Sequence, residues 1–201
     1  MGCDIHLYLE KRNKLGKWEN SEFTKEEFHG GRCYPLFARL ANVRNLWNLE
    51  HLPLRGVPIN ASTEVKKAFL CKIVSDEKYD QMIDDCPMNI IRKTLSIKIL
   101  GDADYKYIKP YIIEDNGDLL QLDKDYILYM LKNDKVSLGK LYITNLDFHS
   151  ANCCTYEEMR QCVQETVKEE YYQSERWFNL LSKMEEYTKE GDCRAIFWFD
   201  N

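Results

Sequence analysis

The sequence predicts an α+β domain whose sheet, mixed or antiparallel, includes a strand at each end of the chain and is packed by helices. Residues 3–10 alternate apolar and polar side chains, which is the period of a strand with one apolar face. Trp18 can begin a second strand after a turn. Residues 194–201 are aromatic and continuous, as in a central strand. A long helical pattern over 156–190 precedes them.

That long pattern carries its own start and stop signals. Thr155 followed three residues later by Glu158 is a capping box, and Gly191 is suited to end the helix. Residues 173–174 are a candidate break that would divide the pattern into two helices. We expect this region to pack against the sheet.

Two shorter helices are expected nearer the N-terminus. Pro35 suits the first turn of a helix over 35–46, where apolar residues follow helical spacing. Ser62 or Thr63 can cap a helix that runs to about Val74. Short helices are expected to continue to about residue 95.

The middle of the chain is expected to mix strands and helices. Residues 97–100 and 107–113 are rich in residues that favour strands, and 116–117 (Asn-Gly) between apolar runs predicts a hairpin. Periodicity predicts a short helix over 123–131, and 140–145 reads as a further strand.

Composition limits the possible functions. The 201 residues include 28 Lys and Arg against 33 Asp and Glu, a net charge of −5, which argues against broad nucleic-acid binding but leaves room for a small basic pocket. With no export signal and no run of 18 apolar residues, we expect a cytoplasmic protein without a membrane partner. Its eight cysteines are then expected to be reduced thiols.

The polar face of the first strand is the first candidate site. Asp4 and His6 lie two residues apart on that face, with Glu10 further along. Such a pair can present a carboxylate and an imidazole to a metal, or pair a general base with its orienting acid. The alternative is an ordinary exposed sheet face.

The second candidate is the segment 147–150, read as lying just before the capped helix. A helix N-terminus attracts phosphate, and His149 with Ser150 could serve there as phosphate donor or acid–base group. The alternative is a turn serine beside a surface histidine. Cys153 and Cys154 are weaker nucleophile candidates, on the expectation that the helix terminus lowers their pKa.

Arginines form the third candidate, because arginine recognises phosphate with two parallel hydrogen bonds. Four lie within 24 residues: Arg32, Arg39, Arg44 and Arg55. Arg55 precedes Gly56 and Pro58, which would hold a fixed loop beside it. The alternative for any one of them is solvated surface charge.

Five ordered segments together resemble a widespread family of small phage-encoded proteins of unassigned function. They are 1–6 with Glu10, 34–45, 55–58 with Ser62, 149–150, and the terminal 196–201 (Ile-Phe-Trp-Phe-Asp-Asn). The matching residues make up about a fifth of the chain and span both of its ends.

The resemblance implies one polar site and a neighbouring arrangement of the two terminal strands. The site would contain Asp4, His6, Arg44, Arg55, Ser62 and His149, with Asp200 brought to the same edge. The chain departs from the family pattern at Asn60, where an acidic residue is expected, and at Cys153–Cys154. The resemblance also implies a core formed by 1–64 and 146–201, with 65–145 inserted as an α/β subdomain or lid.

These residues suit a protein that binds a phosphate-bearing, nucleotide-like molecule through the implied site and Ser150, for instance a phage protein that sequesters a bacterial immune signal in the cytoplasm of the infected host. No cofactor is expected, and the loss of the acid at Asn60 favours binding over chemistry. One alternative is a phosphodiesterase or other hydrolase that uses His6 and His149, or a divalent metal held by Asp4, His6, His149 and Asp200. Another is a host-takeover factor that binds protein through 65–145. A homo-oligomer is expected.

Overall fold

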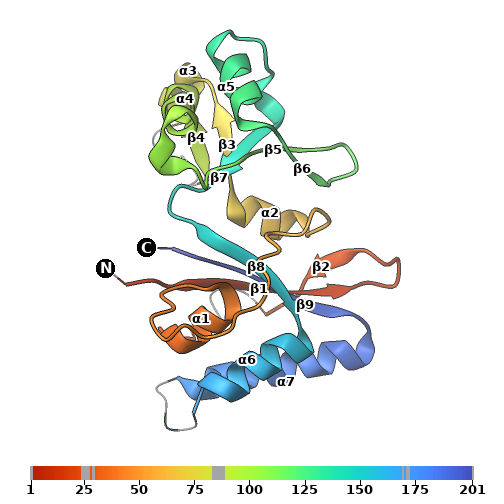
Figure 1. Cartoon of the computed structure of the whole chain (residues 1–201). Coiled ribbons are helices and arrows are strands. Elements are labelled where there is room, and N and C mark those ends of the chain that lie inside the picture. Colours follow the sequence, from red (N-terminus) through yellow and green to blue (C-terminus); the bar gives the residue numbers. More distant parts are fainter. Residues whose placement is uncertain are drawn as a thin grey trace. The chain divides into compact units, whose positions relative to one another are not determined.

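The computed structural model describes residues 2–23, 28, 30–82, 89–168, 170 and 173–200. The chain forms two compact units, one from Met1–Val65 with Asp147–Asn201 and the other from Lys66–Leu146. Figure 1 shows the elements of both units. Each unit has its own sheet and its own hydrophobic core.

The first unit is built on a four-stranded antiparallel sheet in the order β2-β1-β9-β8. Its strands are β1 (Ile5–Arg12), β2 (Trp18–Asn20), β8 (His149–Thr155) and β9 (Cys193–Phe199). The predicted strands at the two ends of the chain are confirmed. They lie next to each other, so that the start of β1 meets the end of β9 (Figure 1).

Three helices pack with one face of this sheet: α1 (Tyr34–Ala41), α6 (Tyr156–Thr166) and α7 (Ser174–Glu190). α6 and α7 run side by side along the sheet (Figure 1). The core between helices and sheet includes Leu7, Leu9, Phe37, Trp177 and Phe197, all essentially inaccessible to solvent. The alternation over 3–10 therefore predicted the buried face correctly.

The helix boundaries follow local signals. Thr155 and Glu158 form the predicted capping box, and the long pattern is divided before Ser174, as expected. α1 is shorter than predicted because Asn42 adopts a left-handed conformation (φ 58°), which ends the helix.

The second face of β1 is buried at His6 and Glu10, half-buried at Tyr8 and exposed at Asp4 and Arg12, so it is not uniformly the exposed face of the alternative interpretation. Trp198 of β9 stacks on the rings of both Tyr8 and His6. His6 and Glu10 therefore have mainly protein neighbours rather than water.

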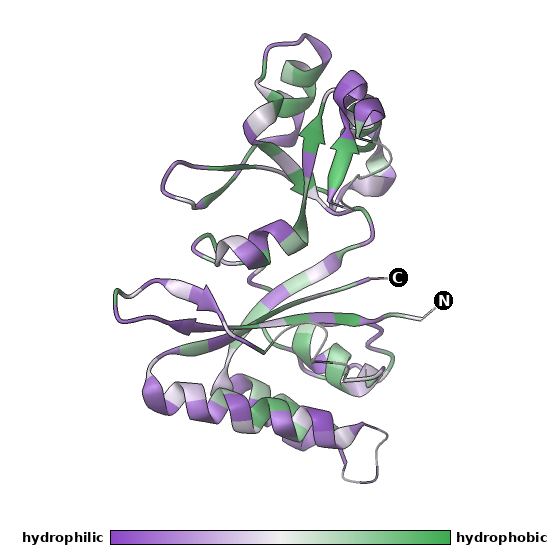
Figure 2. Ribbon diagram, turned by 180° about the vertical axis from the view of Figure 1, so that it is seen from behind, coloured by the Kyte–Doolittle hydropathy of each residue, from purple (hydrophilic) through white to green (hydrophobic). Residues whose placement is uncertain are grey.

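The second unit has a five-stranded sheet in the order β4-β3-β7-β5-β6, in which only the β3–β4 pair is parallel. Its strands are β3 (Leu70–Val74), β4 (Ile90–Arg92), β5 (Pro110–Ile113), β6 (Leu119–Gln121) and β7 (Leu141–Thr144). Its helical segments are α3 (Asp76–Gln81), α4 (Lys93–Gly101), α5 (Lys124–Lys132) and the short η1 (Ala103–Tyr105) and η2 (Leu138–Lys140), with α2 (Thr63–Phe69) leading into it. β3 and β4 are predominantly hydrophobic (Figure 2).

Two local predictions in this region are wrong. Residues 97–100, expected to be extended, lie in α4, where Ile99 and Leu100 join the core of the unit and tertiary packing overrides strand propensity. The helix expected from residue 63 to Val74 ends at Phe69, because the apolar run that follows pairs with both β4 and β7.

Other predictions for this region are confirmed. The Asn116–Gly117 turn joins the antiparallel strands β5 and β6, with Gly117 at φ 88°. Asp123 caps α5 through a hydrogen bond from the Tyr126 backbone N–H. No helix within the described residues is long and apolar enough to cross a membrane.

Candidate functional site

The sheet register brings both ends of the chain to one place. Phe199 of β9 lies opposite Ile5 on one side and His149 on the other. Asp4 precedes Ile5 and Asp200 follows Phe199, and the Asp200 backbone N–H donates to the Asp4 carbonyl at 3.2 Å. The structure therefore brings Asp4, Asp200 and His6 together, whereas His149, which is paired with Phe199, lies at the same end of the sheet on the opposite face from His6.

His6 and Asp200 form the centre of this arrangement. His6 Nε2 lies 2.9 Å from Asp200 Oδ2, and the other carboxylate oxygen accepts the Asp4 backbone N–H at 3.0 Å. The His6 ring also lies 4.8 Å from the Phe148 ring and 6.1 Å from that of Trp198, measured between centroids. The imidazole is thus held between a carboxylate and apolar rings.

Arg32 adds a fixed guanidinium beside this pair. Its Nε and Nη2 donate to the two oxygens of Asp4 at 2.8 and 3.0 Å, and this hydrogen bonding holds the pKa of Asp4 below its ordinary value. Gly2 lies against the same guanidinium, because a Cβ at residue 2 would come within 1.9 Å of Arg32 Nη1. Arg32 was one of the four candidate arginines, but the site implied by the resemblance did not include it, and its position in a loop gave no periodic signal that would pair it with Asp4.

Arg44 contributes a second guanidinium. It lies over the Tyr34 ring, 4.9 Å from the centroid, and its Nη1 donates to the Tyr34 hydroxyl at 3.4 Å. Burial raises the pKa of the Cys3 thiol and the charge of Arg44 opposes this rise, which places Arg44 within electrostatic reach of Cys3. Since Cys3 precedes Asp4, Arg44 belongs to the same end of the sheet.

His149 reaches this end of the sheet from β8. Its ring stacks on Phe199 at 6.1 Å between centroids, and Nδ1 lies 3.0 Å from the Ser150 hydroxyl oxygen. Ser150 has a left-handed backbone (φ 51°) within an irregularity of the β8–β9 pairing. The prediction that His149 lies at a helix N-terminus is wrong, because the whole of β8 separates it from α6.

We call the set Asp4, His6, Arg32, Arg44 and Asp200 the terminal-strand site. It combines two guanidinium groups, one imidazole and two carboxylates. Such a mixture can bind an anion through the cations, or transfer protons through a histidine held by a carboxylate.

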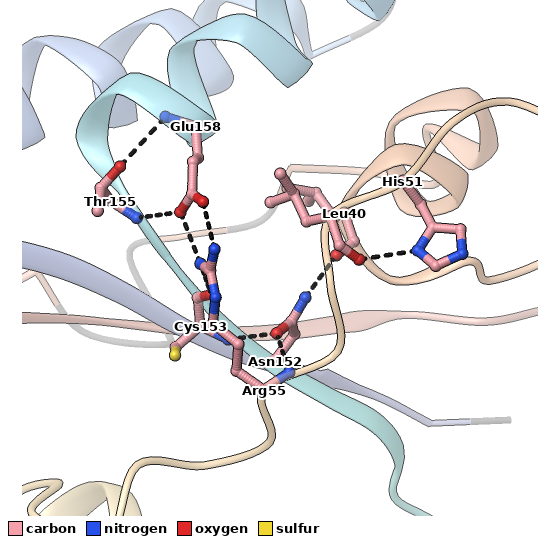
Figure 3. Close-up of polar contacts among 8 residues, drawn as sticks. Leu40, His51, Arg55, Asn152, Cys153, Thr155 and Glu158 are labelled. Atoms are coloured by element: carbon pink, nitrogen blue, oxygen red, sulfur yellow. Dashed lines mark hydrogen bonds and ion pairs between the residues drawn. The ribbon is translucent and has the colours of Figure 1, made fainter.

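Arg55 lies elsewhere, in a separate network (Figure 3). Its guanidinium donates to both carboxylate oxygens of Glu158 at 2.5 and 2.7 Å and to the Cys153 carbonyl at 3.0 Å. Its backbone N–H donates to the Asn152 side chain, which also donates to the Leu40 carbonyl. Arg55 therefore fastens its loop to β8 and to the start of α6, and its contact with Glu158 holds the pKa of that carboxyl below its ordinary value.

Ser62 belongs to a third cluster around Glu10. Glu10 accepts the Ser62 backbone N–H at 2.6 Å and forms an ion pair with Arg194 at 2.6 Å. Arg194 also donates to the Asn60 side chain at 3.0 Å and lies 3.9 Å from the centroid of the Trp18 ring. The single site implied by the resemblance is therefore divided: Arg55 and Ser62 take part in structural networks apart from the terminal-strand site.

The cysteine prediction is also wrong in its chemistry. Burial raises the pKa of Cys153, and that of Cys154 more strongly, so the nearby helix does not activate them. Burial likewise raises the pKa of Cys162 to about 11 and that of Cys193 to about 12. Cys86 lies outside the described residues.

Comparisons with known proteins assign neither a family nor a function to this chain. The chain matches no protein-family model, no curated protein and no solved structure. Within the part of the chain that the structure describes, no three His, Cys, Asp or Glu side chains are grouped so as to hold a metal ion.

Proposed function

We propose that the chain binds a small phosphate-bearing, nucleotide-like molecule at the terminal-strand site. The observation that carries this proposal is the position of Arg32, Arg44 and His6 at the end of the sheet where the two terminal strands pair. Guanidinium and imidazolium groups are the side chains that recognise phosphate oxygens most directly.

The carboxylates of the site fit this role as positioning groups. Asp4 holds the Arg32 guanidinium through two hydrogen bonds, and Asp200 holds the His6 ring. Donors that are fixed before the ligand arrives lose less conformational entropy on binding. The two guanidinium groups then provide fixed positive charge for an anionic ligand.

The resemblance to phage proteins suggests a biological setting for such binding. A protein that captures a nucleotide signal of a bacterial immune system would work in the cytoplasm of the infected host. Capture needs only affinity and no chemical step. This use follows from analogy with the phage family and extends the proposed binding function.

The His6–Asp200 hydrogen bond favours one alternative, a phosphodiesterase. A carboxylate that orients an imidazole is a recurring acid–base arrangement, and here Asp200 holds the His6 ring. In such hydrolysis water adds to phosphorus, the ester P–O bond breaks, and a histidine protonates the leaving oxygen.

A release experiment separates the two functions. The protein is incubated with cyclic dinucleotides, cyclic oligonucleotides and ADP-ribose, with and without EDTA, and is then heat-denatured. Mass spectrometry of the solution is expected to show one compound depleted and then returned intact on heating. Return as a cleaved product would establish the alternative, and the EDTA arm would show whether a metal takes part. Depletion of none of these compounds would contradict both.

A further inference from the structure

The loop that carries Arg44 is closed at its base. The Asn42 N–H donates to the Ala38 carbonyl and the Leu52 N–H donates to the Arg39 carbonyl, each at 2.8 Å. Both ends of the segment 42–52 are thus fastened to the last turn of α1. A compact surface loop with adjacent ends is a frequent carrier of function.

The loop is held in a strained conformation. Asn42, Arg44 and Asn48 all have left-handed backbones, with φ of 58°, 49° and 51°. Asparagine tolerates this conformation, but for arginine it costs about 1–2 kcal/mol. The Asn45 side chain stabilises the loop by donating to Asn42 Oδ1 and the Leu49 carbonyl and accepting the Leu49 N–H, all within 2.9 Å.

The loop exposes side chains of residue types that are usually buried in proteins. Val43 is inserted into the core, whereas Leu46 is 88% exposed and Trp47 is 53% exposed. Trp177 and Trp198 are buried, and Trp18 lies beneath Arg194. Trp47 is therefore the tryptophan that this chain presents to solvent most openly.

Trp47 lies on the same loop as Arg44. It follows Arg44 by three residues, so their Cα atoms lie no more than about 11 Å apart. Arg44 in turn lies over the Tyr34 ring, and Tyr34 contacts Phe37, which contacts Phe199, the β9 residue opposite Ile5. An indole and a guanidinium on one rigid loop match a ligand that has an aromatic ring and a phosphate.

We infer that loop 42–52 is the recognition loop of the terminal-strand site, in which Trp47 stacks on the base of a nucleotide while Arg44 contacts its phosphate. This inference rests on the proposed function and deepens it, since it makes the base a determinant of affinity. The Asn45 hydrogen bonds are positioning contacts that keep both side chains in place. A protein partner would also use an exposed tryptophan and arginine, and the test includes that outcome.

The test compares probes with and without a base. Calorimetry measures the affinity of the full chain for AMP, ADP-ribose and cyclic di-AMP, with ribose 5-phosphate as the baseless probe. For Trp47→Ala we expect a loss of about 5- to 150-fold for the nucleotides and no change for ribose 5-phosphate. Trp47→Phe should keep most of the affinity, and Leu46→Ala, its exposed neighbour, is the matched control. Arg44→Gln should weaken all four probes.

The opposing outcomes are distinct. If the wild type binds nucleotides and Trp47→Ala binds them equally well, the inference is overturned and the proposed function stands. If the wild type binds none of the four probes, both are overturned. If Trp47→Ala changes the sedimentation of the protein but not its nucleotide affinity, the loop is a protein interface and the inference is overturned. Circular dichroism of each variant confirms that it is folded.

Discussion

His6 and Asp200 are 194 positions apart in the sequence, yet His6 Nε2 lies 2.9 Å from Asp200 Oδ2. The contact exists because β1 and β9 are antiparallel neighbours, with Ile5 opposite Phe199. The Asp4 backbone N–H fixes the second oxygen of Asp200. The candidate site is therefore formed only when the first and last strands of the chain have paired, which couples its geometry to completion of the fold.

Removing the Arg32 guanidinium should raise the pKa of Asp4. In the folded protein the hydrogen bonds from Arg32 lower this pKa, so the pair stabilises the fold above the unfolded pKa of Asp4 and loses that contribution as pH falls through the folded value. The stability difference between wild type and Arg32→Gln should thus be full at neutral pH and vanish in acid. Carbon-13 NMR titration of the Asp4 carboxyl checks the shift.

The same titration contains its own control. The pKa of Asp115 in the second unit is lowered by Lys140, and Arg32→Gln should leave it unchanged. An Asp4 pKa that is the same with and without Arg32 would contradict the geometry described for this pair.

Breaking the Glu10–Arg194 pair should destabilise the first unit strongly. Glu10 is fully inaccessible and the Arg194 side chain is 13% exposed, so Arg194→Met leaves a buried charge without its counter-ion. We expect a loss of about 3–5 kcal/mol in the free energy of unfolding, measured in urea, with much of it recovered in the double variant Glu10→Met/Arg194→Met.

Arg12 provides the matched control for this measurement. It also lies over Trp18, but its ion pair with Asp192 is exposed. Arg12→Met should cost under about 1 kcal/mol. If Arg194→Met and Arg12→Met lowered the free energy of unfolding equally, the prediction that burial makes the Glu10–Arg194 pair more stabilising would be contradicted.

The Arg55–Glu158 contact should contribute to stability and not to ligand affinity. Its geometry is bidentate but Arg55 is partly exposed, so a double-mutant cycle with Arg55→Ala and Glu158→Ala should give a coupling energy of about 1 kcal/mol. Neither variant should change affinity for the probe nucleotides by more than about twofold. If the folded Arg55→Ala variant lost much of its nucleotide affinity, Arg55 would belong to the binding site, and the structural role assigned to it would be contradicted.

Much of the fold could be predicted because its signals are local. The alternation over 3–10 and the capping box at Thr155 depend on residues a few positions apart. The Asn116–Gly117 turn is likewise local. The extended prediction for 97–100 failed because packing in α4 decided the outcome there, and local propensity did not contain that information.

The site was predictable only in part, for a related reason. Asp4 and His6 could be paired from their spacing on one strand. The partners of Arg32, Arg55 and Glu10 depend on sheet register and loop path across 28, 103 and 184 positions. Periodic sequence patterns contain no information on such distant contacts. Arginines in similar sequence contexts can therefore have different partners in the structure.

Chemical-shift mapping tests the proposed binding site most directly. The amide resonances of isotope-labelled protein are recorded while AMP, ADP-ribose or cyclic di-AMP is added, and the measurement is repeated with His6→Ala. We expect the largest shifts at Asp4, His6, Arg32 and Arg44 and their neighbours, and the loss of these shifts in the variant. Shifts confined to Arg55 and Glu158 or to the second unit, or no shifts with any of these nucleotides, would contradict the terminal-strand site as the place where the ligand binds.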